Sequence, residues 1–88
     1  MDVRYDAREY VLPMSHSKPI PEYYLENMSS NQLWIARNEI FARHGRTFDS
    51  SYLSNYFASC SWYQGTVGKE NFDESVFSQI EKENIWMI

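Results

Sequence analysis

The residues from Ser29 to Gly45 carry both a start signal and a stop signal of an α-helix, and they constrain the fold more than any other stretch. Ser29 and Gln32 have the spacing of a capping box, in which two polar side chains satisfy the first free N–H groups of a helix. Gly45 stands where glycine commonly takes the left-handed conformation that ends a helix. The sequence therefore predicts a helix that is capped at Ser29 and runs through residues 33–44.

The chain before this helix is predicted to cross the domain without regular structure. Two prolines at alternate positions fix the backbone and remove hydrogen-bond donors, so residues 14–21 favour an extended or turn-like path. A short helix is expected over residues 21–27, because proline suits a first helical turn. Residues 85–88 are all apolar. We expect this end of the chain to dock on the domain, as a short strand beside residues 10–12.

Two further helices are expected after Gly45. Asp49 is of the residue type that caps a helix, here one that begins at Ser50. Asp73 is expected to cap a fourth helix, with an apolar side formed by Val76, Phe77 and Ile80. A chain of 88 residues has room for one core, so we assign residues 10–88 to a single domain and residues 1–9 to an N-terminal flank. The predicted fold class is mainly all-α, with three to four helices.

A helical wheel places two polar side chains inside the apolar stripe of the helix over residues 33–44. Arg37 and His44 face inward on this wheel, whereas Glu39, Arg43, Ile35 and Ala42 face outward. We expect the inward pair to bond to the backbone of residues 12–20, which has few partners of its own, so that Arg37→Ala costs about 2–4 kcal/mol. The alternative is that Arg37, Arg43 and His44 bind an anionic ligand, such as a carboxylate of a cell-wall peptide.

The many aromatic residues divide into a predicted core set and a pair in a loop. The core set, taken from helical spacing, is Tyr52, Tyr56, Phe57, Phe72 and Phe77. Trp62 and Tyr63 lie in a loop with glycines, where we expect them to fold back as a lid on the core. The alternative is a pair of exposed rings that stack on a sugar or a partner. Trp34 and Trp86 are expected in the core or at its rim, and Cys60 as a small buried hydrophobe rather than a nucleophile.

Composition and motifs exclude several classes of function. The net charge of −4 argues against a nucleic-acid partner, and the single cysteine excludes a cysteine-rich zinc site. No apolar run reaches the ~18 residues of a membrane span, so no membrane insertion is expected here. His16 and His44 are the candidate bases, but no catalytic or metal motif accompanies them, and we predict no catalytic residue, metal or cofactor. The charged start of the chain is no signal peptide, which fits an intracellular protein or a domain of a longer chain.

Residues 36–46, Ala-Arg-Asn-Glu-Ile-Phe-Ala-Arg-His-Gly-Arg, resemble the YARHG domain of bacterial proteins. Phe41 replaces the tyrosine of the family's name string and loses only a phenol hydroxyl. The resemblance covers roughly residues 10–86 and implies a structural motif made of Arg37, Glu39, Phe41, Arg43, His44 and Gly45. It implies an extracellular or cell-surface module of bacterial, mostly Gram-positive, proteins, which occurs in lipoproteins and beside peptidase domains. It implies no reaction.

From these observations we expect a non-enzymatic accessory or binding module of a bacterial surface or secreted protein. Its ligand is expected to be a cell-wall component or a protein, and neighbouring domains of a longer chain are expected beside it. The candidate contact residues are Arg43, His44, Trp62 and Tyr63. Two alternatives stay open at this point: a substrate-recognition module attached to a cell-wall hydrolase or peptidase, and an intracellular protein-interaction domain.

Overall fold

The computed structural model describes residues 10–88, and within that range it contains four α-helices and no strand. The α-helices are α1 (Glu22–Glu26), α2 (Ser30–Arg43), α3 (Ser51–Ala58) and α4 (Gln79–Met87). Two single turns of 3-10 helix, η2 (Lys69–Asn71) and η3 (Glu74–Val76), lie between α3 and α4. The mainly helical fold class is confirmed. The flank predicted for residues 1–9 lies outside the described residues.

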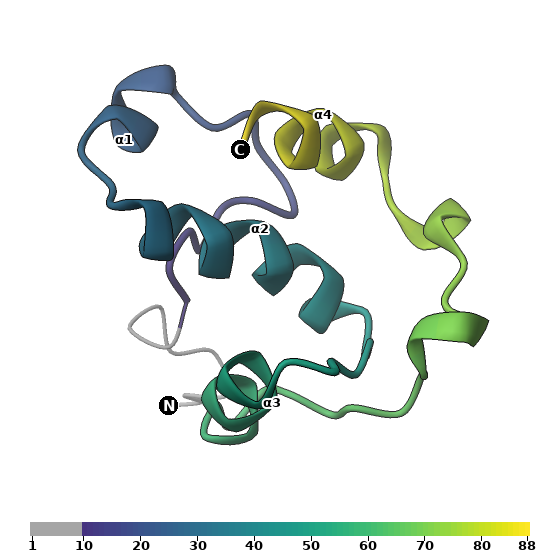
Figure 1. Cartoon of the computed structure of the whole chain (residues 1–88). Helices are drawn as coiled ribbons and strands as arrows, with labels where there is room; N and C mark the ends of the chain where they lie inside the picture. The colour runs from purple at the N-terminus through teal and green to yellow at the C-terminus, as the bar shows by residue number, and fades with distance from the viewer. Residues whose placement is uncertain (1–9) are drawn as a thin grey trace, which may run out of the picture.

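Helix α2 is the central element, and its neighbours cover it on several sides. It contacts both α3 and α4, and Figure 1 shows it lying between them, with α1 near its N-terminal end. Toward α3, it packs Ile35 and Ala42 into a core cluster with Leu53, Phe57 and Cys60. Toward the N-terminal segment, Ala36 packs with Leu12 and Ile20. The wheel's outward placement of Ile35 and Ala42 is therefore wrong, because a central helix buries more than one stripe.

Both ends of α2 follow the signals in the sequence. The Ser29 N–H donates to Gln32 Oε1 at 2.8 Å, and the Gln32 N–H donates to Ser29 Oγ at 3.1 Å, which confirms the capping box. Gly45 has a φ of 86°, in the left-handed region. Its N–H donates to the Ala42 carbonyl at 2.9 Å and the Arg46 N–H to the Phe41 carbonyl at 3.4 Å. These two bonds form a Schellman motif, so Gly45 terminates the helix as expected.

The later helices begin at other residues than predicted. Ser50, not Asp49, caps α3, because its hydroxyl accepts from the Leu53 N–H at 3.2 Å. Asp73 caps only the single turn η3, and its hydrogen bond from the Ser75 N–H lowers the pKa of its carboxyl. The extended backbone at Phe77 then interrupts the helical path. The last helix, α4, starts after a second capping box, which the sequence shows as Ser-x-x-Glu at residues 78–81.

The C-terminal residues dock on the domain, but as a helix. Residues 79–87 form α4, so the predicted two-strand pairing with residues 10–12 is wrong. The second capping box explains the difference, because it nucleates a helix that the four apolar end residues alone do not signal. Ile88 packs against the cluster that contains Leu12 and Ile20, which confirms docking. Trp86, however, is 90% exposed and not in the core or at its rim.

The aromatic residues fall partly where they were predicted. Phe57 and Phe77 are buried, and Phe41, Phe72 and Phe77 form an aromatic group against α2. Trp62 and Tyr63 pack on the α2–α3 cluster, which confirms the lid, and Cys60 is buried as expected. Tyr52 is 51% exposed, so its assignment to the core is wrong. Its ring meets that of Trp34 on the surface, with 5.7 Å between the ring centroids.

Candidate functional site

Polar side chains of α2 hold the start of the described chain against the helices. Glu39 is fully buried, and its two carboxylate oxygens accept from the N–H groups of Val11 at 2.7 Å and Leu12 at 3.1 Å. Arg43 Nη2 donates to the carbonyls of Leu12 at 3.3 Å and Pro13 at 3.0 Å. One turn of α2 therefore supplies both an acceptor and a donor to neighbouring peptide groups of a segment without regular structure.

The electrostatics of this pair depend on burial. Loss of solvent raises the pKa of the Glu39 carboxyl, while the hydrogen bonds from Val11 and Leu12 and the nearby charge of Arg43 oppose that rise. The Arg43 guanidinium also lies over the Tyr10 ring, with its Cζ 4.0 Å from the ring centroid. Arg43 is thus committed to carbonyl oxygens and an aromatic face within the chain.

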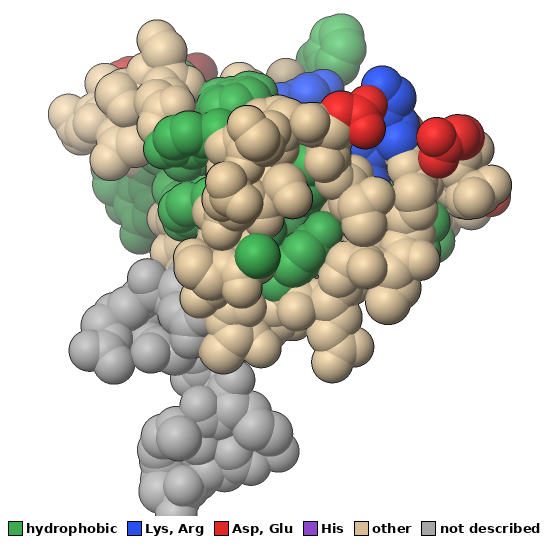
Figure 2. All heavy atoms as spheres, turned by 60° about the horizontal axis from the view of Figure 1, so that its bottom comes forward, with side chains coloured by type: hydrophobic (Ala, Val, Ile, Leu, Met, Phe, Trp, Pro, Cys, Tyr) green, Lys and Arg blue, Asp and Glu red, His purple; other side chains and the backbone are tan. Residues whose placement is uncertain are grey.

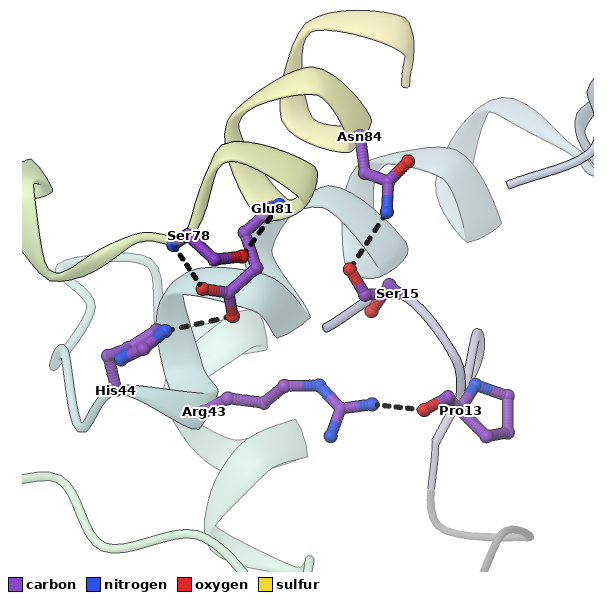
Figure 3. A network of polar contacts seen from close by, with 7 residues as sticks. All are labelled: Pro13, Ser15, Arg43, His44, Ser78, Glu81 and Asn84. Atoms are coloured by element: carbon purple, nitrogen blue, oxygen red, sulfur yellow. Dashed lines mark hydrogen bonds and ion pairs between the residues drawn. The ribbon is translucent and has the colours of Figure 1, made fainter. Parts of the chain in front are cut away.

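Helix α4 adds a second hold on the same segment through Asn84. This side chain is buried, and its Nδ2 donates to the carbonyls of Ser15 at 2.8 Å and Lys18 at 3.0 Å. Its Oδ1 accepts from the Ile20 N–H at 3.2 Å. Figure 3 shows Asn84 reaching from α4 toward Ser15, while Arg43 reaches Pro13 from α2. An amide that both donates and accepts suits an irregular backbone, which exposes both kinds of group.

His44 joins the end of α2 to the start of α4. Its Nε2 lies 2.9 Å from Glu81 Oε2, and Glu81 Oε1 accepts from the Ser78 N–H at 2.9 Å (Figure 3). An ionised carboxylate only accepts hydrogen bonds, so Nε2 donates in this contact when Glu81 is ionised. We call the set of side chains that ties these segments together the polar brace; it consists of Glu39, Arg43, His44, Glu81 and Asn84.

The polar brace corrects the helical wheel. Glu39 and Arg43 were predicted to face solvent, but they make the inward contacts. Arg37 was predicted inward, but it is exposed, and its Nε donates to the Ile85 carbonyl at 3.4 Å. His44 contacts α4 rather than residues 12–20. The wheel assumed one buried side, whereas the N-terminal segment lies on a second side of α2, where its free N–H groups select a carboxylate.

The residues predicted to contact a ligand come together in part. Arg43, His44 and Trp62 line one shallow cavity of about 290 Å³. Tyr63 is not among its lining residues, and its hydroxyl donates to the Arg46 carbonyl at 2.7 Å. The Trp62 ring stacks on Tyr10, with 4.8 Å between centroids. Since Arg43 and His44 are already bonded within the chain, this cavity offers a ligand few free polar groups.

A second cavity, of about 410 Å³, carries more available charge. It lies between α2 and the 3-10 turns, and we call it the basic groove; its lining residues are Arg37, Asn38, Phe41, Arg46, Lys69, Phe72 and Glu74. Three of these side chains are cationic and one is acidic. Figure 2 shows Lys or Arg and Asp or Glu side chains next to one another at the upper edge of one face of the molecule. The basic groove is the part of the surface best suited to an anion.

Two arginines in the basic groove share one aromatic ring. The Cζ atoms of Arg37 and Arg46 lie 5.8 Å and 5.5 Å from the centroid of Phe41. Arg46 also lies 5.1 Å from the centroid of Phe48, so its guanidinium is held between two rings. Within residues 10–88 neither arginine forms an ion pair, whereas Lys69 pairs with Asp49 at 3.2 Å. These guanidinium groups keep donors for a planar anion such as a carboxylate.

The comparison with protein families shows to which family the chain belongs. Residues 8–88 match the YARHG domain. The chain belongs to the YARHG domain family. Searches of curated proteins and of solved structures found no match. The YARHG assignment thus covers nearly the whole chain and leaves the function of the domain open. Within residues 10–88, no helix is long and apolar enough to span a membrane.

The YARHG string of this chain, residues 41–45, combines four structural roles. The Phe41 ring contacts the two arginines of the basic groove. Arg43 and His44 belong to the polar brace, and Gly45 ends α2. Ala42 fills the core against α3. The string is therefore mainly structural, and only its Phe41 side chain lines the basic groove.

The sequence does not predict Glu81 and Asn84 of the polar brace, nor Arg46 and Lys69 of the basic groove. Glu81 and Asn84 carry a signal, since the Ser-x-x-Glu box places Glu81 in the first turn of a helix and Asn84 follows three residues later on the same side. Arg46 and Lys69 carry none, because Arg46 lies in a loop and Lys69 in the single turn η2, which only tertiary folding brings to α2.

Proposed function

We propose that this YARHG domain is a non-catalytic binding module of a bacterial surface or secreted protein, and that its basic groove binds a carboxylate of a cell-wall peptide. One observation carries the proposal: Arg37 and Arg46 lie over the same Phe41 ring, and neither has an ion-pair partner among the described residues. Arg43, by contrast, uses its Nη2 on two backbone carbonyls, and His44 contacts the carboxylate of Glu81.

The surroundings of the two arginines favour a binding role. Arg46 is held between Phe41 and Phe48, which restricts a side chain that otherwise loses entropy when it orders on a ligand. Arg37 Nε donates to the Ile85 carbonyl at 3.4 Å, which leaves the terminal amino groups of Arg37 for a ligand. A preordered fork of donors matches the two oxygens of a carboxylate.

The proposal of a non-catalytic role follows from the side chains in the groove. Its lining consists of arginine, lysine, asparagine, phenylalanine and one glutamate. This set provides charge, donors and aromatic surface for binding. It has no serine, cysteine or histidine that would pair with a base for acyl transfer. The surface or secreted location in the proposal comes from the resemblance to the family. Binding to peptidoglycan tests this location together with the ligand.

Retention on insoluble peptidoglycan tests the proposal. We expect the wild-type domain to be retained at low salt and released as salt rises, because an exposed ionic contact is screened. Arg46→Gln is expected to lower retention about 5- to 10-fold, in the range of one charge-assisted contact. Lys18→Gln is the matched control, since it removes one charge from an exposed residue outside the groove. Equal retention of the two variants, or no retention of the wild type, would contradict the proposal.

A further inference from the structure

We propose that the ligand of the basic groove is an extended acidic peptide that also carries an apolar side chain, which packs on Trp86. This inference rests on the proposed function and specifies its ligand class. It starts from a third cavity, of about 220 Å³, which we call the apolar pocket; its lining residues are Arg37, Glu74, Phe77, Lys82, Ile85 and Trp86. Arg37 and Glu74 line both cavities, so the two are adjacent and meet at these side chains.

The apolar pocket has a nearly uncovered indole at its edge. Trp86 is 90% exposed, whereas Phe77, which lines the same pocket, is buried. An indole offers a large apolar surface and one N–H donor, and aromatic rings of this kind dominate the energetics of interfaces. Apolar and basic surfaces that adjoin in this way suit a ligand with both chemistries.

The order of groups along the two cavities suits an extended backbone. Of the basic groove and the apolar pocket, Arg46 and Lys69 line only the groove, Arg37 and Glu74 line both, and Trp86 lines only the pocket; Trp86 also lines a further cavity with Met87. At the junction, a guanidinium can donate to a peptide carbonyl and a carboxylate can accept from a peptide N–H. A small anion would use only the basic end. An acidic peptide supplies a carboxylate, backbone groups and an apolar side chain in that order.

The probes are synthetic peptides of the form acetyl-Asp-Glu, a glycine spacer, then Leu-Phe-amide. The spacer holds one to four glycines, since each extended residue adds roughly 3.3–3.6 Å. Binding is followed by two-dimensional NMR of the ¹⁵N-labelled domain, with the indole N–H signal of Trp86 assigned from Trp86→Phe. A matched peptide ends in Ser-Ser in place of Leu-Phe. We expect one spacer length to shift the signals of Arg46, Lys69 and Trp86 together.

The affinities then separate the inference from the proposed function. We expect the best Leu-Phe peptide to bind about 10-fold more tightly than its Ser-Ser counterpart, and Trp86→Ala to remove that difference. Val76→Ala is the control, because Val76 is also exposed and lines neither cavity. If both peptides shift Arg46 and neither shifts Trp86, the inference is overturned and the proposed function stands. If neither peptide shifts the groove, the proposed function fails as well.

Discussion

The two arginines of α2 allow a direct test of how the YARHG helix works. Arg43 Nη2 donates to two carbonyls of the N-terminal segment, whereas Arg37 is exposed and makes one long bond of 3.4 Å to the Ile85 carbonyl. Arg43→Ala should therefore destabilise the fold strongly, and Arg37→Ala should not. The two substitutions change the same residue type in the same helix, so their effects on helix propensity nearly cancel.

The expected difference follows from what each substitution leaves behind. Arg43→Ala strands the carbonyls of Leu12 and Pro13 and removes the cation beside the buried Glu39. Loss of a partly buried, charged donor of this kind costs about 2–4 kcal/mol. Arg37→Ala removes an exposed side chain and should change stability by less than about 0.5 kcal/mol.

Urea unfolding monitored by circular dichroism, together with thermal melts, measures both values. For a domain of this size, about 2–4 kcal/mol corresponds to a fall in Tm of roughly 10–30 °C. Arg37→Ala should melt within about 3 °C of the wild type. If Arg37→Ala is the more damaging substitution, or if both are neutral, the polar brace as described is wrong.

Three further predictions concern the rest of the fold. Gly45→Ala should cost about 1–3 kcal/mol in urea unfolding, because φ is 86° and a Cβ would lie 3.1 Å from the Gln64 carbonyl oxygen; a neutral result would contradict the left-handed turn. Asn84→Ala should cost about 2–4 kcal/mol by the same assay, since it strands two carbonyls and the Ile20 N–H, and equal stability would show that water replaces the amide. Burial raises the pKa of Glu39, so the folded protein binds this proton more tightly than the unfolded chain. The free energy of unfolding of the wild type, relative to that of Glu39→Gln, should then be highest below the ordinary glutamate pKa of about 4.3. It should fall as pH rises toward the pKa of Glu39 in the folded protein. If it falls on acidification instead, the hydrogen bonds to Glu39 outweigh its burial.

Capping residues and a terminating glycine correctly predict both ends of α2, because such signals depend only on a few neighbouring residues. Ser29, Gln32 and Gly45 start and stop α2 as their residue types indicate. The start of α4 differs from the prediction, because Asp73 caps only the single turn η3, whereas the capping box of Ser78 and Glu81 starts α4. Nothing in the sequence near Asp73 indicates that Phe77 adopts an extended backbone and ends the helical path.

Tertiary packing determines which sides of α2 are buried, and a helical wheel alone does not show this. A periodic pattern identifies one buried side of a helix, but α2 is buried by α3 on one side and by the N-terminal segment on another. Glu39 and Arg43 are charged, so the helical wheel places them in solvent. In the structure they form hydrogen bonds with the backbone of the N-terminal segment. Polar residues of this helix hold an irregular segment, as the sequence predicts, but they are Glu39 and Arg43 rather than Arg37 and His44.

Hydrogen exchange of single backbone amides tests the central claim most directly, namely that buried polar side chains hold the N-terminal segment on the helices. The N–H groups of Val11 and Leu12 donate to Glu39, and that of Ile20 donates to Asn84. We predict that all three are protected in the native protein, and that Glu39→Gln lowers protection at Val11 and Leu12 more than at Ile20. Exchange of these amides at the rate of an unstructured peptide in the wild-type domain would contradict the account.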